Sequence, residues 1–396
     1  MNFSQKPKEK NFTANRNEPE PRTNGMMSNI KFAAFARFAV YFFLLSNVQI
    51  FAQENHLASF SDPARLWGNG IERVIEEAYR QYFKTRIIGD RVMNVRIPFA
   101  MNNERDLLLE SGWRIHGDGK GNPDMLWPII DRILDSADFA EYINALSSGN
   151  EKVIIFDIKD RKWTVTAERF IIARIKAGSY TGLPHRPFVL TSGKGALESD
   201  VFNYLFCVGH VGIDCSGFVW QILAYIGRRG GIDLGKTLSQ ALGAPPGADP
   251  ARYAGTSFYN SRNPQVISIN DEIRNLRPAD VLLFRDFDGT IVHSAIIQSI
   301  DWEGGVIRYL QCNSVAPPQE RGVHEAFIHF NPANTAVSLK DPSLHWTKKR
   351  FGAFPGEEVP FIDDGERYRY RLNGGGRVIR IRALIPVTES LNINTR

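Results

Sequence analysis

Cysteine is scarce in this chain of 396 residues, and histidine is not common. The three cysteines are Cys207, Cys215 and Cys312, and the eight histidines show no paired spacing. Structural zinc sites need four cysteine or histidine ligands at short, regular intervals. The sequence therefore contains no metal-binding motif, and nothing in it demands a cofactor. An odd number of cysteines also leaves at least one thiol outside any disulfide within the chain.

Net charge is nearly absent outside the first 52 residues. The whole chain has a net charge of +5, but residues 1–52 hold seven basic and three acidic side chains. The remainder carries 41 basic and 40 acidic side chains. Proteins that bind nucleic acid usually concentrate positive charge on one surface. We therefore expect no nucleic-acid partner.

A long uninterrupted hydrophobic run is also missing. The most apolar stretch, residues 38–52, is broken by polar residues between 46 and 49 and is short for a membrane span. Lys31 and Arg37 precede it, and the small residue Ala52 ends it. This pattern predicts a secretory signal peptide, and hence export to the periplasm, the cell envelope or the medium. An uncleaved N-terminal anchor is the alternative.

Residues 1–26 are polar and rich in lysine, asparagine, glutamate and proline, so we expect them to be disordered. Met26 or Met27 is an alternative first residue of the natural chain. We treat residues 1–52 as a disordered leader and signal peptide, and base the fold prediction on the rest.

Residues 53–195 form the first predicted structural region. Helical spacing of apolar residues occurs over 63–83 and 125–146, and a hairpin is predicted over 151–175. A loop rich in glycine and proline, 182–195, marks its end. This mixed α/β region shows no chemical signature, and its role stays open.

Residues 196–345 have a different pattern, with helices followed by an antiparallel meander. Helices are predicted over 197–206 and 215–227, a loop-rich insertion over 228–265, and strands over 280–285, 290–301 and 306–314. The fold class predicted for the chain is therefore α+β. Residues 346–396 are predicted to form an extension that ends in a basic β-hairpin.

Cys215 lies where a helix is predicted to begin. Asp214 before it is a good N-cap residue, so the thiol falls in the first turn of the helix. The helix dipole and unpaired N–H groups of that turn favour a thiolate and can stabilise an oxyanion, with Asp214 and Ser216 as the capping residues. The alternative is a cysteine that only packs in the core.

The string "DCSGF" at residues 214–218, followed by an apolar helix, resembles the start of the central helix in NlpC-type cell-wall cysteine peptidases, a papain-like family. Members of that family continue with a Gly-Asp-Leu-Val-Phe-Phe-like strand and a strand that bears the catalytic histidine. Here "ADVLLF" at 279–284 resembles the first strand and "VHSAIIQS" at 292–299 the second. The resemblance covers about residues 197–330.

The resemblance implies a papain-like core, in which a helix bearing Cys215 packs on an antiparallel sheet bearing His293. It implies thiolate attack by Cys215, with His293 as base and then acid, on amide bonds of peptidoglycan stem peptides. The bond between D-glutamate and a diamino acid is the one that the family cleaves. An amidase or acyltransferase acting on another acyl substrate is one alternative, and a non-catalytic envelope binding protein is a second.

Two residues are candidates for the third catalytic residue, and both are amides on the strand at 306–314. Gln311 and Asn313 share one face of that strand by alternation. With a turn at Gly304-Gly305, Asn313 is expected to pair near Ile296, so we rank Asn313 ahead of Gln311 as the residue that orients the histidine.

Two further features near Cys215 need an interpretation. Cys312 faces away from the two amides, and one hypothesis pairs it with Cys207 in a disulfide that leaves Cys215 free. The string "HVGI" at 210–213 copies the family's histidine motif, but His210 lies upstream of the cysteine. We therefore expect His210 to be a loop residue.

The C-terminal hairpin is strongly basic. One strand is predicted to carry Arg367, Arg369 and Arg371, and the other Arg380 and Arg382. Peripheral contact with an anionic envelope surface is one interpretation, and a solvated face that protects an edge strand is the one that we favour. The expected partner is peptidoglycan or a cell-wall peptide, and the oligomeric state stays open.

Overall fold

The computed structural model describes most of the chain from residue 70 onward. The described residues are 70–99, 121–147, 152–157, 162–166, 169, 172–173, 188–190, 195–209, 211–286, 288–313, 322–351, 358–362, 370–371 and 375–393. All of them belong to one compact unit, residues 62–396. The predicted leader and signal peptide lie outside the described residues.

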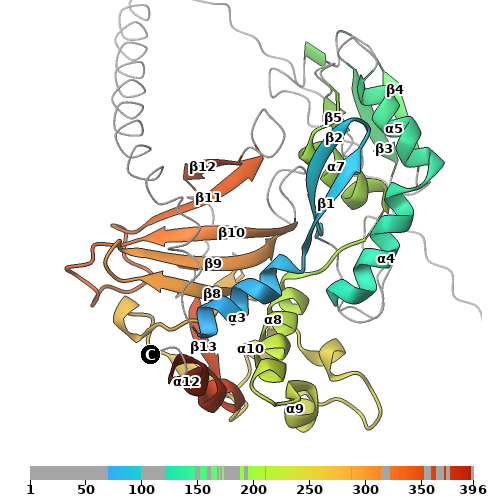
Figure 1. Ribbon diagram of the computed structural model, residues 1–396. Helices are drawn as coiled ribbons and strands as arrows, with labels where there is room; N and C mark the ends of the chain where they lie inside the picture. The colour runs from blue at the N-terminus through green and yellow to red at the C-terminus, as the bar shows by residue number, and fades with distance from the viewer. Residues whose placement is uncertain are drawn as a thin grey trace, which may run out of the picture. The chain divides into compact units, whose positions relative to one another are not determined.

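An antiparallel sheet of eight strands dominates the described structure (Figure 1), in the order β12-β11-β10-β9-β8-β7-β13-β6. Together with the helices it confirms the α+β fold class. The strands are β6 (Val266–Ile269), β7 (Val281–Arg285), β8 (Ile291–Asp301), β9 (Val306–Asn313), β10 (Gly322–His329), β11 (His345–Phe351), β12 (Glu358–Ile362) and β13 (Arg377–Ile381).

Both faces of this sheet are covered, which explains why β7 is apolar at every position but its last. Along β7, Val281 and Leu283 belong to one hydrophobic core, while Leu282 and Phe284 belong to another on the opposite face. Successive strand residues point to opposite faces, so a strand buried on both sides needs apolar residues at every position. The three predicted strands over 280–314 are confirmed as β7, β8 and β9.

Two helices, α3 (Ile71–Arg80) and α8 (Cys215–Arg229), contact each other and lie against β8 (Figure 1). In α3 the buried residues recur at helical spacing, among them Val74, Ile75 and Ala78. In α8 most of the residues are buried, as expected for a helix between a sheet and other helices. The prediction of a helix that begins at Cys215 is confirmed.

The region before residue 195 forms smaller elements that share the core of the main sheet. The elements are β1 (Phe83–Ile88), β2 (Arg91–Arg96), α4 (Pro123–Leu134), α5 (Ala137–Ser147), β3 (Val153–Asp157), β4 (Lys162–Thr166) and β5 (Phe188–Leu190), followed by α7 (Glu198–Tyr204) and a π-helical turn, η1 (Leu205–Gly209). Strands β4-β3-β5 make a small sheet, and the antiparallel β3–β4 pair confirms the first part of the hairpin predicted over 151–175. Residues 169, 172 and 173 are helical rather than part of a strand.

The helical stretch predicted over 125–146 is confirmed, but as two helices rather than one, because the chain breaks at residues 135–136 between α4 and α5. Ser136 accepts a hydrogen bond from the N–H of Phe139 at 3.2 Å through its hydroxyl, and one from Ala140 at 3.1 Å through its carbonyl. A serine in this position caps a new helix start. Apolar spacing continues across the break, which is why it predicted one helix.

The C-terminal strand is not part of a separate basic hairpin. β13 lies between β6 and β7 and pairs with both, and the chain then continues into η6 (Arg382–Leu384) and α12 (Ile385–Ile393). Arg380 binds the buried Asp280 through two hydrogen bonds of 2.6 and 2.8 Å. The basic hairpin predicted at the end of the extension 346–396 is therefore wrong. Its second strand, β13, pairs with β6 and β7, which lie far away in sequence. Arg367 and Arg369 lie outside the described residues.

The predicted boundaries at 195/196 and 345/346 divide one packed unit. The main core joins Ile75 from the first region, Phe218 from the second and Ile381 from the third. The insertion at 228–265 folds onto this core as α9 (Leu234–Leu242), η2 (Pro250–Tyr253) and α10 (Thr256–Tyr259). A short turn, η3 (Ile273–Asn275), then leads toward β7.

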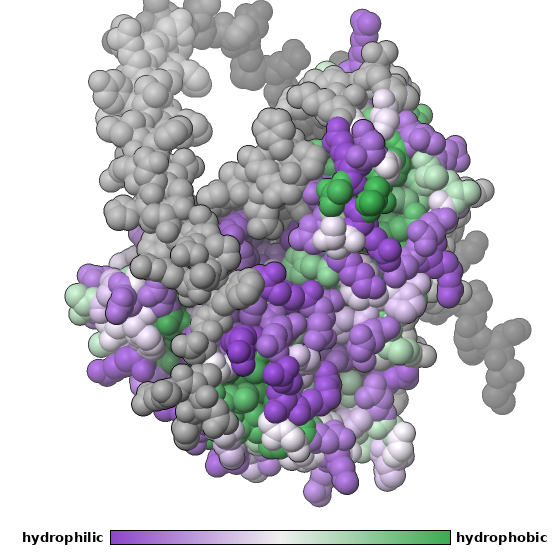
Figure 2. Space-filling view, viewed as in Figure 1, coloured by the Kyte–Doolittle hydropathy of each residue, from purple (hydrophilic) through white to green (hydrophobic). Residues whose placement is uncertain are grey.

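On the face drawn in Figure 2, the apolar residues that are coloured lie in several separate groups. Ile87 and Val92, which are paired across β1 and β2, are the most exposed large hydrophobic side chains among the described residues, at 79% and 65%. Within the part of the chain that is described, no helix combines the length and apolarity that crossing a bilayer requires.

Candidate active site

The start of α8 is built by a capping network. The Asp214 carboxylate accepts a hydrogen bond from the Gly217 N–H at 2.5 Å and another from the Ser216 hydroxyl at 3.0 Å. All three residues are buried. This confirms Asp214 as the N-cap, and it fixes the first turn of the helix on which Cys215 lies.

The loop before α8 is held by a close backbone contact. The Ile213 N–H donates to the Pro98 carbonyl at 3.0 Å, and a Cβ atom at Gly212 would collide with that same carbonyl. A glycine is therefore required where the two chain segments meet. His210, which we expected to be a loop residue, lies outside the described residues.

The Cys215 thiol lies against the start of β8. Its side chain is buried, and Sγ donates a hydrogen bond to the Val292 carbonyl at 3.9 Å. Burial, and then the negative charge of Asp214, raise the pKa of Cys215 to about 12, while hydrogen bonds from Ser294 and Ser216 oppose the shift. The sequence predicted the opposite direction from the helix dipole; burial outweighs that effect here.

This raised pKa predicts slow alkylation of Cys215 in the native protein. A pKa of about 12 leaves roughly one thiol in 10⁵ ionised at pH 7. We expect the rate of iodoacetamide labelling, followed by peptide mass mapping, to rise about tenfold per pH unit from pH 6 to 9.5. A rate that is already constant near pH 7 would instead show a preformed thiolate–imidazolium pair.

His293 lies on the opposite face of β8 from α8 and is held by an amide. Its Nε2 is 2.6 Å from Oε1 of Gln311, and its ring centroid is 5.2 Å from that of Phe284. The side chain is 5% exposed. The structure thus joins His293 to Gln311, the residue that we ranked second, rather than to Asn313.

The ranking of Asn313 rested on a wrong strand register. Leu310, not Asn313, pairs with Ile296, and Gln311 pairs with Ala295, two residues after His293. Asp301 pairs with Val306, so the turn holds the four residues 302–305 rather than the two glycines alone, and a bulge between Ile297 and Ser299 shifts the register by one more residue. An inserted residue of this kind leaves no clear mark in a sequence. Asn313 is buried at the end of β9, opposite Gly322 on β10.

Sequence reasoning missed His324, which continues the network on β10. Gln311 and His324 are paired across β9 and β10, and Nε2 of Gln311 is 3.0 Å from Nε2 of His324. Nδ1 of His324 is 2.7 Å from the Gly322 carbonyl. The only signal in the sequence was its place in the alternating strand 322–329, whose pairing partner was not predicted.

The structure brings the thiol and the histidine to the same strand, but from different sides. The thiol contacts residues 292 and 294, and the His293 side chain between them points to the face of Phe284. The register between β7 and β8 shifts between Phe284 and Arg285, next to His293. A hydrogen bond between Cys215 and His293 stays a prediction.

Comparison with protein-family models, with curated proteins and with solved structures found no match to this chain. The papain-like core therefore stays a prediction as well. Any function has to be argued from the residues and contacts of the site itself.

Cys312 is a second buried thiol close to the site. It is free, and its Sγ donates to the Ile213 carbonyl at 3.0 Å, in the loop that leads into α8. The hypothesis of a disulfide with Cys207 is therefore wrong for this structure, because Cys312 packs under the loop as a buried hydrogen-bond donor. The side chain of Cys207 lies outside the described residues.

The insertion at 228–265 contributes a side chain to the site. Tyr259 of α10 is fully buried, and its hydroxyl donates to the Ser216 carbonyl at 3.3 Å. Burial, followed by the charges of Asp214 and Cys215, raises the pKa of Tyr259. The insertion thus packs against the first turn of α8.

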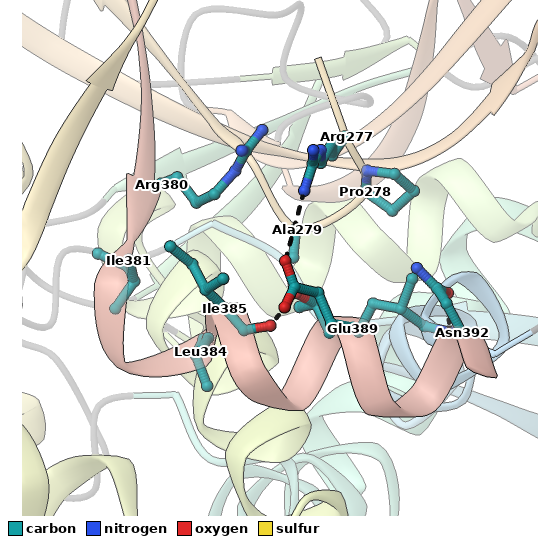
Figure 3. Close-up of a pocket in the computed structure, with 11 residues that line it drawn as sticks. Arg277, Pro278, Ala279, Arg380, Ile381, Leu384, Ile385, Glu389 and Asn392 are labelled. Carbon is teal, nitrogen blue, oxygen red and sulfur yellow. Dashed lines mark hydrogen bonds and ion pairs between the residues drawn. The ribbon is translucent and has the colours of Figure 1, made fainter. Parts of the chain in front are cut away.

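The described residues offer little for a metal ion or for an anionic ligand. No group of three or more metal-ligating side chains occurs among them. A small pocket of about 90 Å³ lies between α12 and the segment before β7 (Figure 3). Arg277 lies 3.9 Å from Glu389 there, and Arg380 on the wall is bound to Asp280. Both arginines are engaged by carboxylates, so the pocket offers little charge for an anionic ligand.

Proposed function

We propose that this protein is an exported cysteine hydrolase that cleaves amide bonds in peptidoglycan stem peptides. The finer proposal, based on the sequence resemblance, is an endopeptidase acting on the bond between D-glutamate and a diamino acid. Cys215 is the nucleophile, His293 the base and acid, and Gln311 the residue that orients His293.

One observation carries the proposal. The thiol at the first turn of α8 is hydrogen-bonded to the carbonyl of Val292 on β8, directly before His293, and the His293 ring is held at Nε2 by an amide oxygen. With Nε2 engaged by Gln311, Nδ1 is the nitrogen that serves the thiol. A nucleophile, a base and an orienting group in that order are the parts of a Cys-His-amide site.

A backbone feature supports the resemblance independently. Ala279 has φ 74°, in the left-handed region, and its N–H donates to the Ile297 carbonyl at 2.9 Å. This conformation favours glycine, and glycine is the residue that the NlpC-type pattern carries at this position. A left-handed conformation at the glycine position of that pattern supports the resemblance.

The proposed reaction starts from a neutral thiol and a neutral imidazole. As Cys215 Sγ attacks the amide carbonyl carbon, Nδ1 of His293 removes the thiol proton, and N–H groups of the first turn of α8 stabilise the oxyanion. The tetrahedral intermediate collapses, His293 protonates the leaving amine, and a thioester remains. His293 then removes a proton from water, which hydrolyses the thioester and regenerates the thiol.

A second candidate function is a non-catalytic envelope binding protein. The observation in its favour is the buried, protonated thiol, whose pKa of about 12 differs from that of an activated nucleophile.

The test uses the full chain, as wild type and as Cys215→Ala, purified in the same way. Each is incubated with cell-wall sacculi and with defined stem peptides, and the products are identified by mass. Peptide fragments released by the wild type alone would support the hydrolase and name the bond. Binding to sacculi without fragments from either protein would favour the binding protein, and turnover of other acyl substrates alone would favour an amidase or acyltransferase.

A further inference from the structure

A chain of hydrogen bonds crosses three strands behind the proposed base. It runs from His293 on β8 through Gln311 on β9 to His324 on β10, and ends at the Gly322 carbonyl. Its three distances are 2.6, 3.0 and 2.7 Å. The side chains of His293, Gln311 and His324 are all at least 95% buried.

The carbonyl at the end of the chain decides the direction of every bond in it. A carbonyl oxygen only accepts, so Nδ1 of His324 carries a proton and donates to Gly322. In a neutral imidazole the other nitrogen, Nε2, then has only a lone pair, and it accepts from the amide N–H of Gln311. This orientation of the amide turns Oε1 of Gln311 toward His293, and that oxygen accepts from Nε2–H of His293.

His324 has to be neutral for this polarity, and its surroundings favour the neutral form. Burial, followed by the positive charges of Lys348 on β11 and Arg96 on β2, lowers the pKa of His324 well below 6.5, and His293 adds to the effect. Its hydrogen bond to Gly322 acts in the opposite direction but is the weaker influence. His324 therefore stays a fixed acceptor over the physiological pH range.

We propose that His324 is a positioning residue that fixes the tautomer of His293, with the proton on Nε2 and the lone pair on Nδ1. His324 acts through Gln311 and does not touch the substrate. The lone pair on Nδ1 is the one that removes the thiol proton in the proposed reaction, and to that extent the catalytic consequence rests on the proposed function. The tautomer itself does not depend on it.

Replacing His324 by a residue without a hydrogen-bond acceptor is expected to release the tautomer of His293. In His324→Leu the Gln311 amide loses the lone pair that His324 offers it, and it can turn so that its NH₂ group faces His293. That orientation favours the opposite tautomer, with the proton on Nδ1. In His324→Gln an amide oxygen can take the place of the imidazole acceptor, so this variant is the conservative replacement.

The test measures the tautomer directly, by two-bond ¹⁵N–¹H correlation NMR of ¹⁵N-histidine-labelled full chain. We expect the wild type and His324→Gln to show His293 protonated at Nε2, and His324→Leu to show a population protonated at Nδ1. His329→Leu is the matched control: His329 lies on the same strand and is bound to Thr347 at 2.9 Å, outside the network. Thermal unfolding of each variant establishes that it is folded.

The activity arm uses kcat/KM on whichever substrate the wild type cleaves. We expect a loss of about 10- to 100-fold in His324→Leu, in kcat rather than in KM, a changed acid limb of the pH profile, and recovery in His324→Gln. Wild-type His293 protonated at Nδ1, or an unchanged tautomer in His324→Leu, would overturn the inference. A tautomer change in a protein without hydrolytic activity would uphold it and reject the proposed function.

Discussion

Replacing His293 with alanine is expected to lower kcat/KM for amide hydrolysis by about 10²- to 10⁴-fold. The base matters more here than in a site with a preformed ion pair, because the pKa of Cys215 is raised to about 12 and the thiol loses its proton only as it attacks. The measurement is steady-state cleavage of a defined stem peptide.

The control for this variant is His329→Ala. His329 is also a partly buried histidine of the same sheet, and burial lowers its pKa to about 4, but its partner is Thr347 rather than Gln311. We expect nearly full activity from it. Equal losses in the two variants would mean that the effect of His293 is one of stability and not of proton transfer.

Replacing Arg308 with methionine is expected to lower the free energy of unfolding by about 3–5 kcal/mol. Arg308 on β9 is almost completely buried and forms 2.5 Å ion pairs with Glu76 of α3 and Glu325 of β10. Without Arg308, the buried carboxylates of Glu76 and Glu325 lose the positive charge that both of them bind. Lys349 still reaches Glu325 at 2.8 Å. Chemical denaturation at pH 7 measures the difference.

The exposed pair of Arg274 and Glu272 is the control, since Arg274→Met is expected to lower the free energy of unfolding by no more than about 1 kcal/mol.

The effect at Arg308 also depends on pH. Although burial opposes it, Arg308 and Lys349 lower the pKa of Glu325 from 4.5 to about 2. The stabilisation is therefore complete above about pH 4.5 and is lost as the pH falls toward 2. A wild-type advantage that stays constant through this range would contradict the network.

The elements next to Cys215 and His293 could be predicted because local patterns determine them. Asp214 before an apolar run marks a helix start, and the two turns that join β7, β8 and β9 separate strands that are adjacent in sequence. His293 and Gln311 were both named as candidates for this reason. Their order relative to Asn313 depended on the length of the turn between β8 and β9 and on a bulge in β8, and alternation alone reveals neither.

The rest depends on contacts between residues that are far apart in the chain. β13 pairs with β6 and β7 about 100 residues upstream, and no local pattern favours that partner over a hairpin. His324 joins the network only because β10 aligns it with Gln311. The burial that raises the pKa of Cys215 is likewise a property of the packed site, while the helix dipole is visible in the sequence.

The central claim is that Cys215 attacks the substrate, and the two buried thiols of the site allow a matched test. Cys312 is free, buried and bonded to the loop that leads into α8, but it is not at a helix start. We predict that Cys215→Ala reduces kcat/KM for stem-peptide hydrolysis by at least about 10⁴-fold and that Cys312→Ala keeps most of it. Undiminished hydrolysis in Cys215→Ala, with the variant folded, would contradict the account.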